Sequence, residues 1–495
     1  MSATVSSAQT IALPWSGHGH DPQHTGLSKV ASQPLNRIKW QTSVDLHPQY
    51  SGNDLLVHYG SPLITRLNTV IIPVKTNPVG LPETFRVEAR SGSDGGLIWS
   101  QDSDYILPAH GWTPMFGIAL TPKNRVYFPA AGGRVGYRDT PDVAGGATGH
   151  IAFYGLVNYS NNPSSFDQSV KINTPITSDR YGNIYFGFIA AGSTTPALQS
   201  GLARIAEDGT GIWIGAGTAA GDAGITQVAM NCAPALSNDH KTLYIAVNSG
   251  GFSSGYLLAL DSRTLATLHS VRLKDAHNPI NNASIPDDGT AAPAVGPDGD
   301  VYFGVLESPF YSNHLRGWLL HFNSTLTVAK TPGAFGWDDT ASILPASCVS
   351  AYTGTSTYLL LTKYNNYVGG GGDGVNKIAV LDPNDTMTDP ITGTTVMKEI
   401  ITKSGPTPDE EYAESGHPNA VREWCVNSVA VDPFTKSGII NSEDGNLYRW
   451  DFTTNTFSQS IAFPVGIGEA YTPTMIGVDG TVYAISNAVL YAIGQ

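Results

Sequence analysis

The chain has 495 residues, of which only 14% are charged, and its formal net charge is −14 at pH 7. This acidic balance, without any cluster of lysine and arginine, argues against nucleic acid and anionic membranes as main partners, because phosphate binding needs a basic surface. No apolar run is long enough for a membrane span. The 54 glycines and 32 prolines are spread along the chain as turn residues, and helical periodicity is almost absent. We therefore expect an all-β protein.

The first distinctive segment is the histidine-rich run WSGHGHDPQHTGLS at residues 15–28. It resembles the opening of secreted bacterial proteins with PQQ-like β-propeller repeats, which implies a structural motif and a secreted or periplasmic location. The close spacing of His18, His20 and His24 also suits a metal ion, but the resemblance favours the structural role, and we predict no metal site. Residues 1–9 have neither a basic start nor an apolar core, so we expect no signal peptide in the sequence as given.

Eight times along the chain a small residue, usually followed by proline, opens a short apolar run that closes around a Gly/Asn/Asp turn and a strand rich in valine or tyrosine. Each repeat predicts a hairpin that cannot bury both of its faces alone, and radial stacking of such units gives a β-propeller. We predict eight blades, with seven as the alternative, because the sixth interval is long and the seventh opening lacks proline. The openings are Ser61-Pro62, Thr113-Pro114, Thr174-Pro175, Ala233-Pro234, Ala292-Pro293, Leu344-Pro345, Asn427-Ser428 and Thr472-Pro473.

The two ends of the chain are predicted to share a blade. After the last opening there is room for only about two strands before Gln495. Residues 36–44 alternate polar and apolar side chains over the length of one strand, and they precede the first hairpin. We therefore predict that this N-terminal strand closes the ring and removes the open sheet edges. Residues 1–34 then form an N-terminal arm, and residues 35–495 form a single propeller.

Two internal segments extend the family resemblance. Residues 86–99 are similar to the PQQ-like repeat, in which a glycine turn leads to a docking tryptophan, and residues 206–213 are a weaker copy. The resemblance implies the fold of the quinoprotein alcohol dehydrogenases. Those enzymes carry an adjacent cysteine pair over the quinone, whereas Cys232, Cys348 and Cys425 are far apart in this sequence. The chain is thus closer to the noncatalytic and uncharacterised secreted group. For Cys348 and Cys425, near consecutive inner strands, a disulfide and two buried thiols both stay open.

The candidate site follows from propeller geometry, because the segments just before the innermost strands converge on one rim of the central channel. We predict catalytic roles for His58, Tyr59, His110, Arg422 and Tyr471, whose side chains suit acid–base work. We predict ligand-binding roles for Trp112, Lys171, Asn231, Asp339, Glu423, Trp424 and Glu469. The same positions also hold Asn173, Cys232, Asp287, Asp288 and Asp338. For any single residue, packing or turn stabilisation is the competing interpretation.

We expect this central funnel to bind a carbohydrate or a protein ligand. The enzymatic alternative is a polysaccharide lyase, in which Arg422 or Lys171 neutralises a uronate, His58 or His110 acts as the base and Tyr59 or Tyr471 as the acid. Glycoside hydrolysis comes second, with Asp338, Asp339, Glu423 and Glu469 as candidate carboxylates, although adjacent carboxylates on a strand usually point apart. A PQQ-dependent dehydrogenase is the third possibility.

No cofactor is predicted. Calcium stays open, because Asp382, Asn384, Asp385 and Asp389 offer oxygen ligands, although the same residues suit an ordinary turn. We expect a monomer whose partner is a glycan or a protein. The acidic segment 408–414 lies in a long insertion before Arg422, where it would form a flap over the funnel or stay solvated.

Overall fold

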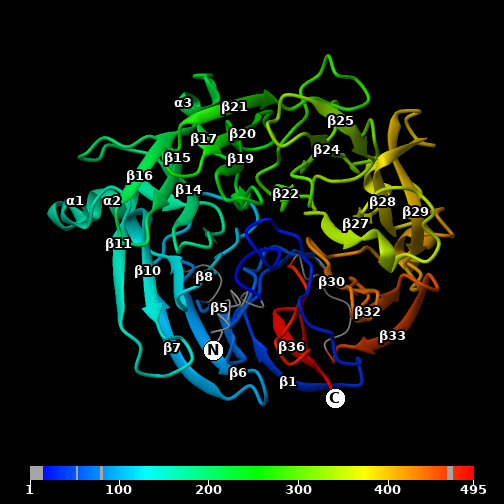
Figure 1. Cartoon of the computed structure of the whole chain (residues 1–495), viewed down its shortest axis with the longest axis horizontal. Helices are drawn as coiled ribbons and strands as arrows, with labels where there is room; N and C mark the ends of the chain where they lie inside the picture. Colours follow the sequence, from blue (N-terminus) through cyan, green and yellow to red (C-terminus); the bar gives the residue numbers. More distant parts are fainter. Residues whose placement is uncertain (1–14, 52–53, 78–81, 465–471) are drawn as a thin grey trace, which may run out of the picture.

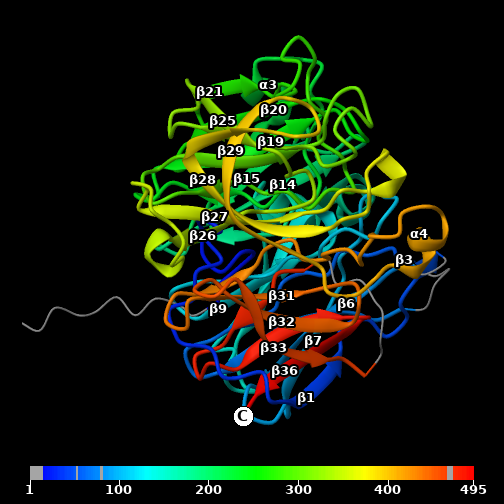
Figure 2. The ribbon, with the colours of Figure 1, turned by 90° about the vertical axis from the view of Figure 1, so that its right-hand side faces the viewer.

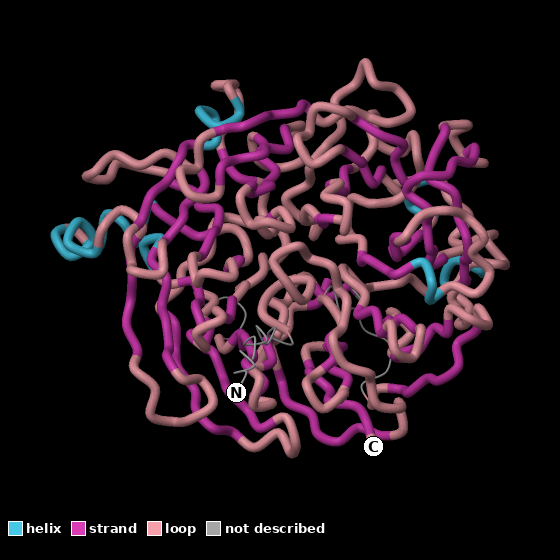
Figure 3. The backbone as a smooth tube through the Cα atoms, viewed as in Figure 1, coloured by secondary structure: helices cyan, strands magenta, loops and turns pink. Residues whose placement is uncertain are grey.

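The computed structural model describes residues 15–51, 54–77, 82–464 and 472–495. Within these ranges the chain forms eight sheets arranged like blades around a central axis, as Figure 1 and Figure 3 show. The all-β prediction and the count of eight blades are both confirmed.

The first half of the ring contains four blades, each built from consecutive strands. Blade 1 consists of β4 (Leu63–Ile64), β5 (Thr69–Lys75), β6 (Phe85–Ser91) and β7 (Leu97–Ser103). Blade 2 consists of β8 (Ala119–Leu120), β9 (Arg125–Pro129), β10 (Arg134–Asp139) and β11 (Thr148–Ala152). Blade 3 contains β12 (Val170–Ile172), β13 (Thr177–Ser178), β14 (Ile184–Ala190), β15 (Gly201–Ile205) and β16 (Gly211–Gly215). Blade 4 contains β17 (Gln227–Val228), β18 (Ala235–Leu236), β19 (Thr242–Asn248), β20 (Tyr256–Asp261) and β21 (Thr267–Arg272).

The second half repeats the same order. Blade 5 consists of β22 (Ala294–Val295), β23 (Val301–Val305), β24 (Trp318–Phe322) and β25 (Ala329–Gly333). Blade 6 consists of β26 (Ser342–Pro345), β27 (Tyr358–Tyr364), β28 (Lys377–Thr388) and β29 (Thr395–Ser404). Blade 7 consists of β30 (Ala430–Asp432), β31 (Ser437–Asn441), β32 (Asn446–Asp451) and β33 (Thr456–Ala462). Blade 8 consists of β34 (Met475–Ile476), β35 (Val482–Ser486), β36 (Val489–Gly494) and β1 (Arg37–Ser43).

Blade 8 closes the ring in the predicted way. Strand β1 pairs antiparallel with β36, with Arg37 opposite Gly494 and Ser43 opposite Val489. The N-terminal strand is therefore the outer strand of the last blade, and the sheet has its full set of strands. Because the two ends of the chain share one ladder, fraying of either end costs backbone hydrogen bonds in the other.

Helices are few and short, and they lie outside the blades. They are α1 (Leu156–Asn161), α2 (Pro163–Ser169), α3 (Ala216–Ala220) and α4 (Glu410–Glu414), with 3₁₀ turns η1 (Ala131–Gly133), η2 (Ala346–Cys348) and η3 (Val368–Gly370). A small hairpin, β2 (Tyr50–Ser51) with β3 (Asp54–Leu55), precedes blade 1. Among the described residues, none of these helices has the length and apolar character needed to cross a membrane.

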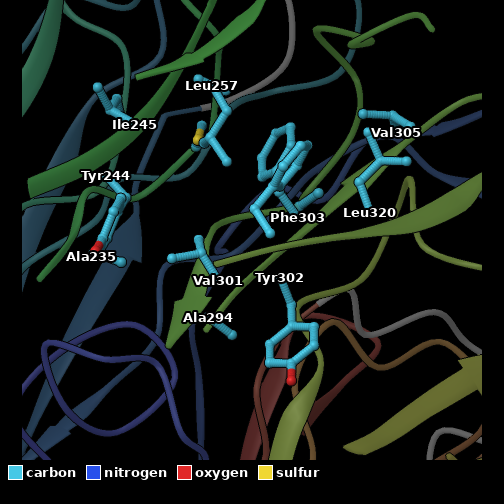
Figure 4. Close-up of a cluster of buried hydrophobic side chains, with 14 of the residues drawn as sticks. Ala235, Tyr244, Ile245, Leu257, Ala294, Val301, Tyr302, Phe303, Val305 and Leu320 are labelled. Atoms are coloured by element: carbon cyan, nitrogen blue, oxygen red, sulfur yellow. The ribbon is translucent and has the colours of Figure 1, made fainter. Parts of the chain in front are cut away.

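Burial explains why the sequence pattern identified the blades. The second strand of each repeat is enclosed on both faces, so β5, β23 and β27 are buried at every residue and read as continuous apolar runs. The outer strand β33 alternates exposed and partly buried residues. Burying a large apolar side chain contributes about 1.5–3 kcal/mol, and Figure 4 shows such side chains from blades 4 and 5 packed against one another, among them Phe303 and Leu257.

The N-terminal arm, residues 15–34, runs through the centre of the propeller, where Figure 1 shows its dark-blue loop. Its backbone hydrogen-bonds to seven of the eight blades in the order of the ring, with blade 3 as the one not joined by these bonds within the described residues. The amides of Ile64, Leu120, Leu236, Val295, Ile343 and Val431 donate to the carbonyl oxygens of Trp15, Ser16, Pro22, Gln23, Thr25 and Gly26, at 2.7–2.9 Å, and Gln33 donates to Gly480 at 2.7 Å. The arm therefore occupies the channel and pairs polar groups that the short inner strands leave open.

The side chains of the histidine-rich run explain its composition. Asp21 accepts hydrogen bonds from the Thr25 amide at 3.0 Å and hydroxyl at 2.6 Å and pairs with His20 at 3.1 Å. His24 bonds the carbonyl oxygen of Pro293 at 2.8 Å. A Cβ on Gly26, whose φ is +63°, would lie 2.5 Å from the carbonyl oxygen of Val429, so only glycine fits this approach. The motif thus shapes the arm inside the channel.

Candidate functional site on the propeller axis

The segments that precede the inner strands meet on the axis, as the geometry of the fold requires. His58 Nε2, before blade 1, donates to the carbonyl oxygen of Asp288, before blade 5, at 2.9 Å. The ring of Trp112, before blade 2, stacks on His58 with centroids 5.4 Å apart, and its amide donates to Asp288 Oδ1 at 3.4 Å. Asn231, between β17 and β18 of blade 4, donates to the carbonyl oxygens of Asp287 and Gly289 at 3.3 Å. Residues from four blades therefore hold one another across the axis.

A buried ion pair lies beside these contacts. Lys363 Nζ is 2.9 Å from Asp338 Oδ2, and the two side chains are 1% and 5% exposed. The other oxygen of Asp338 accepts a hydrogen bond from Thr290 Oγ1 at 2.8 Å. The next residue, Asp339, accepts from Thr362 Oγ1. The two adjacent side chains thus have different hydrogen-bond partners but stay within electrostatic range of the same lysine.

Two acids of this group hold their protons at neutral pH. Burial raises the pKa of Asp339 to about 8, against the opposing effect of Lys363. Burial, and next the charge of Glu443, raise the pKa of Glu423 to about 8. Burial lowers the pKa of His58, so its imidazole is neutral at pH 7. We call His58, Asp338, Asp339, Lys363 and Glu423 the axial cluster.

The insertion before blade 7 carries more carboxyl groups to the same place. Arg422 pairs with Glu443 at 3.2 Å and with Asp409, which caps the N-terminus of α4, at 3.6 Å. The Glu423 amide donates to Glu443 Oε2 at 3.2 Å. In Figure 2, α4 and β3 lie on the right-hand face of the molecule, whereas the arm lies toward the left-hand face. The insertion and the arm therefore approach the axis from opposite faces.

The structure brings together some of the predicted site residues and separates others. His58, Trp112, Asn231, Asp339 and Glu423 lie together on the axis, and Arg422 lies beside Glu423. The other predicted residues have different partners. The Tyr59 hydroxyl donates to Asp45 at 3.1 Å, and His110 pairs with Glu83 at 3.1 Å. Lys171 donates to the Gln168 carbonyl oxygen at 2.9 Å, and Trp424 is fully buried (0% exposed) against Tyr448 and Phe457. Glu469 and Tyr471 lie outside the described residues.

Sequence reasoning missed Lys363, Thr362, Thr290 and Glu443. Lys363 lies on β27 and not in a segment that precedes an inner strand. The sequence prediction considered only those preceding segments and therefore did not include it. Its signal was nonetheless present, because one lysine interrupts the otherwise apolar run YLLLTKY. A charge in a strand buried on both faces requires a buried partner of opposite charge.

The structure also shows the surroundings of the cysteines and of the residues considered for a metal ion. Cys232, Cys348 and Cys425 are buried and none of them is joined in a disulfide, so the disulfide alternative for Cys348 and Cys425 is not formed. Within the described ranges, no group of histidine, cysteine or acidic side chains has the arrangement of a metal site. Asp389, one of the residues considered for calcium, pairs with Arg316 at 2.9 Å.

Comparisons with known proteins agree on the fold. No protein-family model and no curated protein matches the sequence. Among solved structures, the chain is similar to europium-containing methanol dehydrogenase, with a TM-score of 0.56 and 9% identity over 95% of this chain and 89% of the other. It is also similar to quinohemoprotein alcohol dehydrogenase from Comamonas testosteroni, with a TM-score of 0.56 and 11% identity over 99% of this chain and 82% of the other. These likenesses show the fold: the chain is an eight-bladed β-propeller similar in architecture to these two dehydrogenases.

The residues on the axis do not fit PQQ. The quinone carries several carboxylates, and a site for it needs cations that are not already neutralised. Here Lys363 pairs with Asp338, and Arg422 pairs with Asp409 and Glu443. The fold is therefore shared with the dehydrogenases, whereas Lys363 and Arg422 near the axis are already paired with carboxylates.

Proposed function

We propose that this protein is a binding propeller that holds a lysine- or arginine-bearing segment of a partner protein against the axial cluster. One observation carries the proposal: carboxyl groups outnumber cations there, and Glu423 keeps its proton to a pKa of about 8 because of burial and the nearby Glu443. A cation placed beside Glu423 would neutralise the carboxylate in place of that proton. The site therefore favours a positively charged ligand over a neutral or acidic one.

The surroundings support this choice of ligand. Glu423 and Trp112 are partly buried rather than enclosed, so both have surface left for a partner. The indole offers a ring face that attracts ammonium and guanidinium groups. An acidic glycan would meet the carboxyl groups of Glu443 and Asp409, and a neutral glycan would gain nothing from the charge of the cluster. Between the two ligand classes expected from the sequence, a protein segment is favoured.

The test measures binding of fluorescent peptides that differ only in lysine and arginine against glutamine. We expect the basic peptide to bind and the neutral one to bind at least about tenfold more weakly. Glu423→Gln removes the carboxylate that would face the cation, so its affinity for the basic peptide falls by about tenfold at pH 8.5 and less at pH 6.

Glu207→Gln, which changes an exposed glutamate on the flank of blade 3, is the matched control and keeps wild-type affinity. Equal binding of the basic and neutral peptides, or wild-type behaviour of the Glu423→Gln protein at pH 8.5, would contradict the proposal.

Glycoside hydrolysis is the second candidate, and a specific observation favours it over the lyase. A protonated Glu423 within electrostatic range of Asp338, which is ion-paired with Lys363, is the pairing of acid and carboxylate that glycosidases use. The lyase needs a free cation for the uronate, but Arg422 is bound by two carboxylates. Release of nitrophenol from aryl glycosides, abolished by Glu423→Gln, would favour the hydrolase.

A further inference from the structure

A cavity lies on the flank of the propeller, between blades 2 and 3 and away from the axis. Its volume is about 840 Å³, within the range of small-molecule sites. It is lined by residues of β10, β11 and β16, the loop before β16 and the start of α1. Figure 1 shows these elements next to one another at the left of the ring.

Two glycines allow neighbouring segments of the cavity wall to pack closely against one another. A Cβ on Gly211 would lie 2.1 Å from the carbonyl oxygen of Phe153, so the turn of blade 3 can rest against blade 2 only without a side chain there. A Cβ on Gly149 would lie 2.7 Å from the Tyr137 hydroxyl, so the tyrosine ring lies over bare backbone. Both positions are built for close approach.

Two aromatic rings line the cavity and are held in place from behind. Arg125 lies over the Tyr137 ring, 4.4 Å from its centroid, and is fixed by two bonds to Asp139 at 2.6 and 3.0 Å. Trp213 packs edge-on against buried Phe188, with centroids 6.1 Å apart. Both Tyr137 and Trp213 are only partly buried, so each keeps apolar surface for a ligand.

Polar groups with spare bonding capacity complete the lining. In the described part of the chain, neither the Trp213 indole N–H nor the His150 ring makes a hydrogen bond. Burial, and next Arg134, lower the pKa of His150, so its ring is neutral at pH 7 and can both donate and accept. Asp208 accepts a hydrogen bond from the Thr210 amide at 2.9 Å, and its carboxylate is exposed at the rim of the cavity. The cavity therefore offers donors and acceptors beside aromatic surface.

We infer that this cavity between blades 2 and 3 binds a neutral saccharide. A pyranose ring has apolar faces, which stack on aromatic side chains, and hydroxyl groups, which take up unused donors and acceptors. An acidic sugar would meet Glu207 and Asp208, while the one arginine of the lining is already bound by Asp139. A purely apolar ligand would leave the tryptophan N–H and the histidine without partners, which costs free energy.

Tryptophan fluorescence and calorimetry with neutral oligosaccharides of glucose, mannose and N-acetylglucosamine test this inference. We expect at least one of these probes to bind the full-length protein and to change its fluorescence. Trp213→Ala should weaken that binding at least tenfold, and Asp208→Asn, which leaves the packing intact, should weaken it several-fold.

Phe434→Ala is the matched control, because it removes an exposed aromatic ring that is 61% accessible and lies outside this cavity. It should bind the saccharide like the wild type, and so should Glu423→Gln on the axis. Conversely, the Asp208→Asn protein should bind the basic peptide with wild-type affinity. The saccharide site and the peptide site on the axis can therefore be tested separately. Absence of binding by all three sugar series, or wild-type binding by both cavity variants, overturns the inference.

Discussion

Replacing Lys363 by methionine is expected to cost about 3–5 kcal/mol of the free energy of unfolding at pH 7, because it leaves a carboxylate buried without its cation. The side chains of Lys363 and Asp338 are almost fully buried. Asp339 and Glu423 are close enough to interact electrostatically with Lys363. Denaturant titration, followed by circular dichroism, measures the loss.

The pH dependence of that loss distinguishes a charge effect from a packing effect. Lys363 holds the pKa of Asp339 down against the effect of burial, so without Lys363 that pKa rises further above its unfolded value. Stability of the variant is then fully present below the unfolded pKa and is lost as pH rises through the folded pKa. The cost should therefore be small near pH 4 and largest at pH 8. Asp338→Asn combined with Lys363→Met should recover most of it, since no charge is left unpaired.

Lys398→Met provides the control, because that lysine pairs with Asp385 at 2.7 Å but both side chains are about half exposed. An exposed pair is worth about 0–1 kcal/mol. If Lys363→Met costs no more than this surface variant, or costs the same at every pH, the buried pair does not have the role assigned to it.

Acidification is expected to release the N-terminal arm before the blades unfold. Burial lowers the pKa of His18 to about 3 and that of His24 to about 4. Since both values lie below the unfolded value, the stabilisation is fully present above pH 6.5, falls steadily as pH drops from 6.5 toward the folded values, and is gone once pH has passed through them. The loss at pH 4.5 should be on the order of 2 kcal/mol for each histidine.

Trp15→Ala removes the anchor of the arm in blade 1, a tryptophan with 0% exposure, and should cost about 3–5 kcal/mol at pH 7. Hydrogen exchange should show where the loss falls. The protection factors, which compare exchange with the intrinsic rate at the same pH, should fall in the variant and in the wild type at pH 4.5 for the amides that bond the arm, those of Ile64, Leu120, Leu236, Val295 and Ile343. Unchanged protection of these amides in both cases would mean that the arm does not hold the inner strands.

The blade count and the ring closure could be predicted because their causes are local. A turn such as Asp298-Gly299, with φ of +91° at the glycine, and an apolar run such as β23 leave their pattern in consecutive residues. The alternation of polar and apolar residues in β1 is likewise a property of one strand, because an outer strand is only partly buried. The path of the arm left no such pattern, because backbone groups make most of its bonds to the blades.

The axial site was predictable only in part, for a geometric reason. Loops before inner strands do converge, so His58, Trp112 and Asp339 were found. His110 lies in the same kind of loop, but its ring Nε2 pairs with Glu83 Oε2 at 3.1 Å. This pair lines a separate cavity of about 400 Å³. The direction of a side chain in a loop depends on partners far away in the sequence, and a single sequence does not name them.

The measurement that tests the central claim most directly is the number of protons released when a basic peptide binds. Calorimetry in two buffers of different ionisation enthalpy gives this number. Glu423, with a pKa of about 8, is about 90% protonated at pH 7, so binding of a cation beside it should release about 0.9 of a proton there and almost none at pH 9.5. Glu423→Gln should release none from this position. Tight binding of the peptide at pH 7 with no proton released, or with proton uptake, would contradict the account.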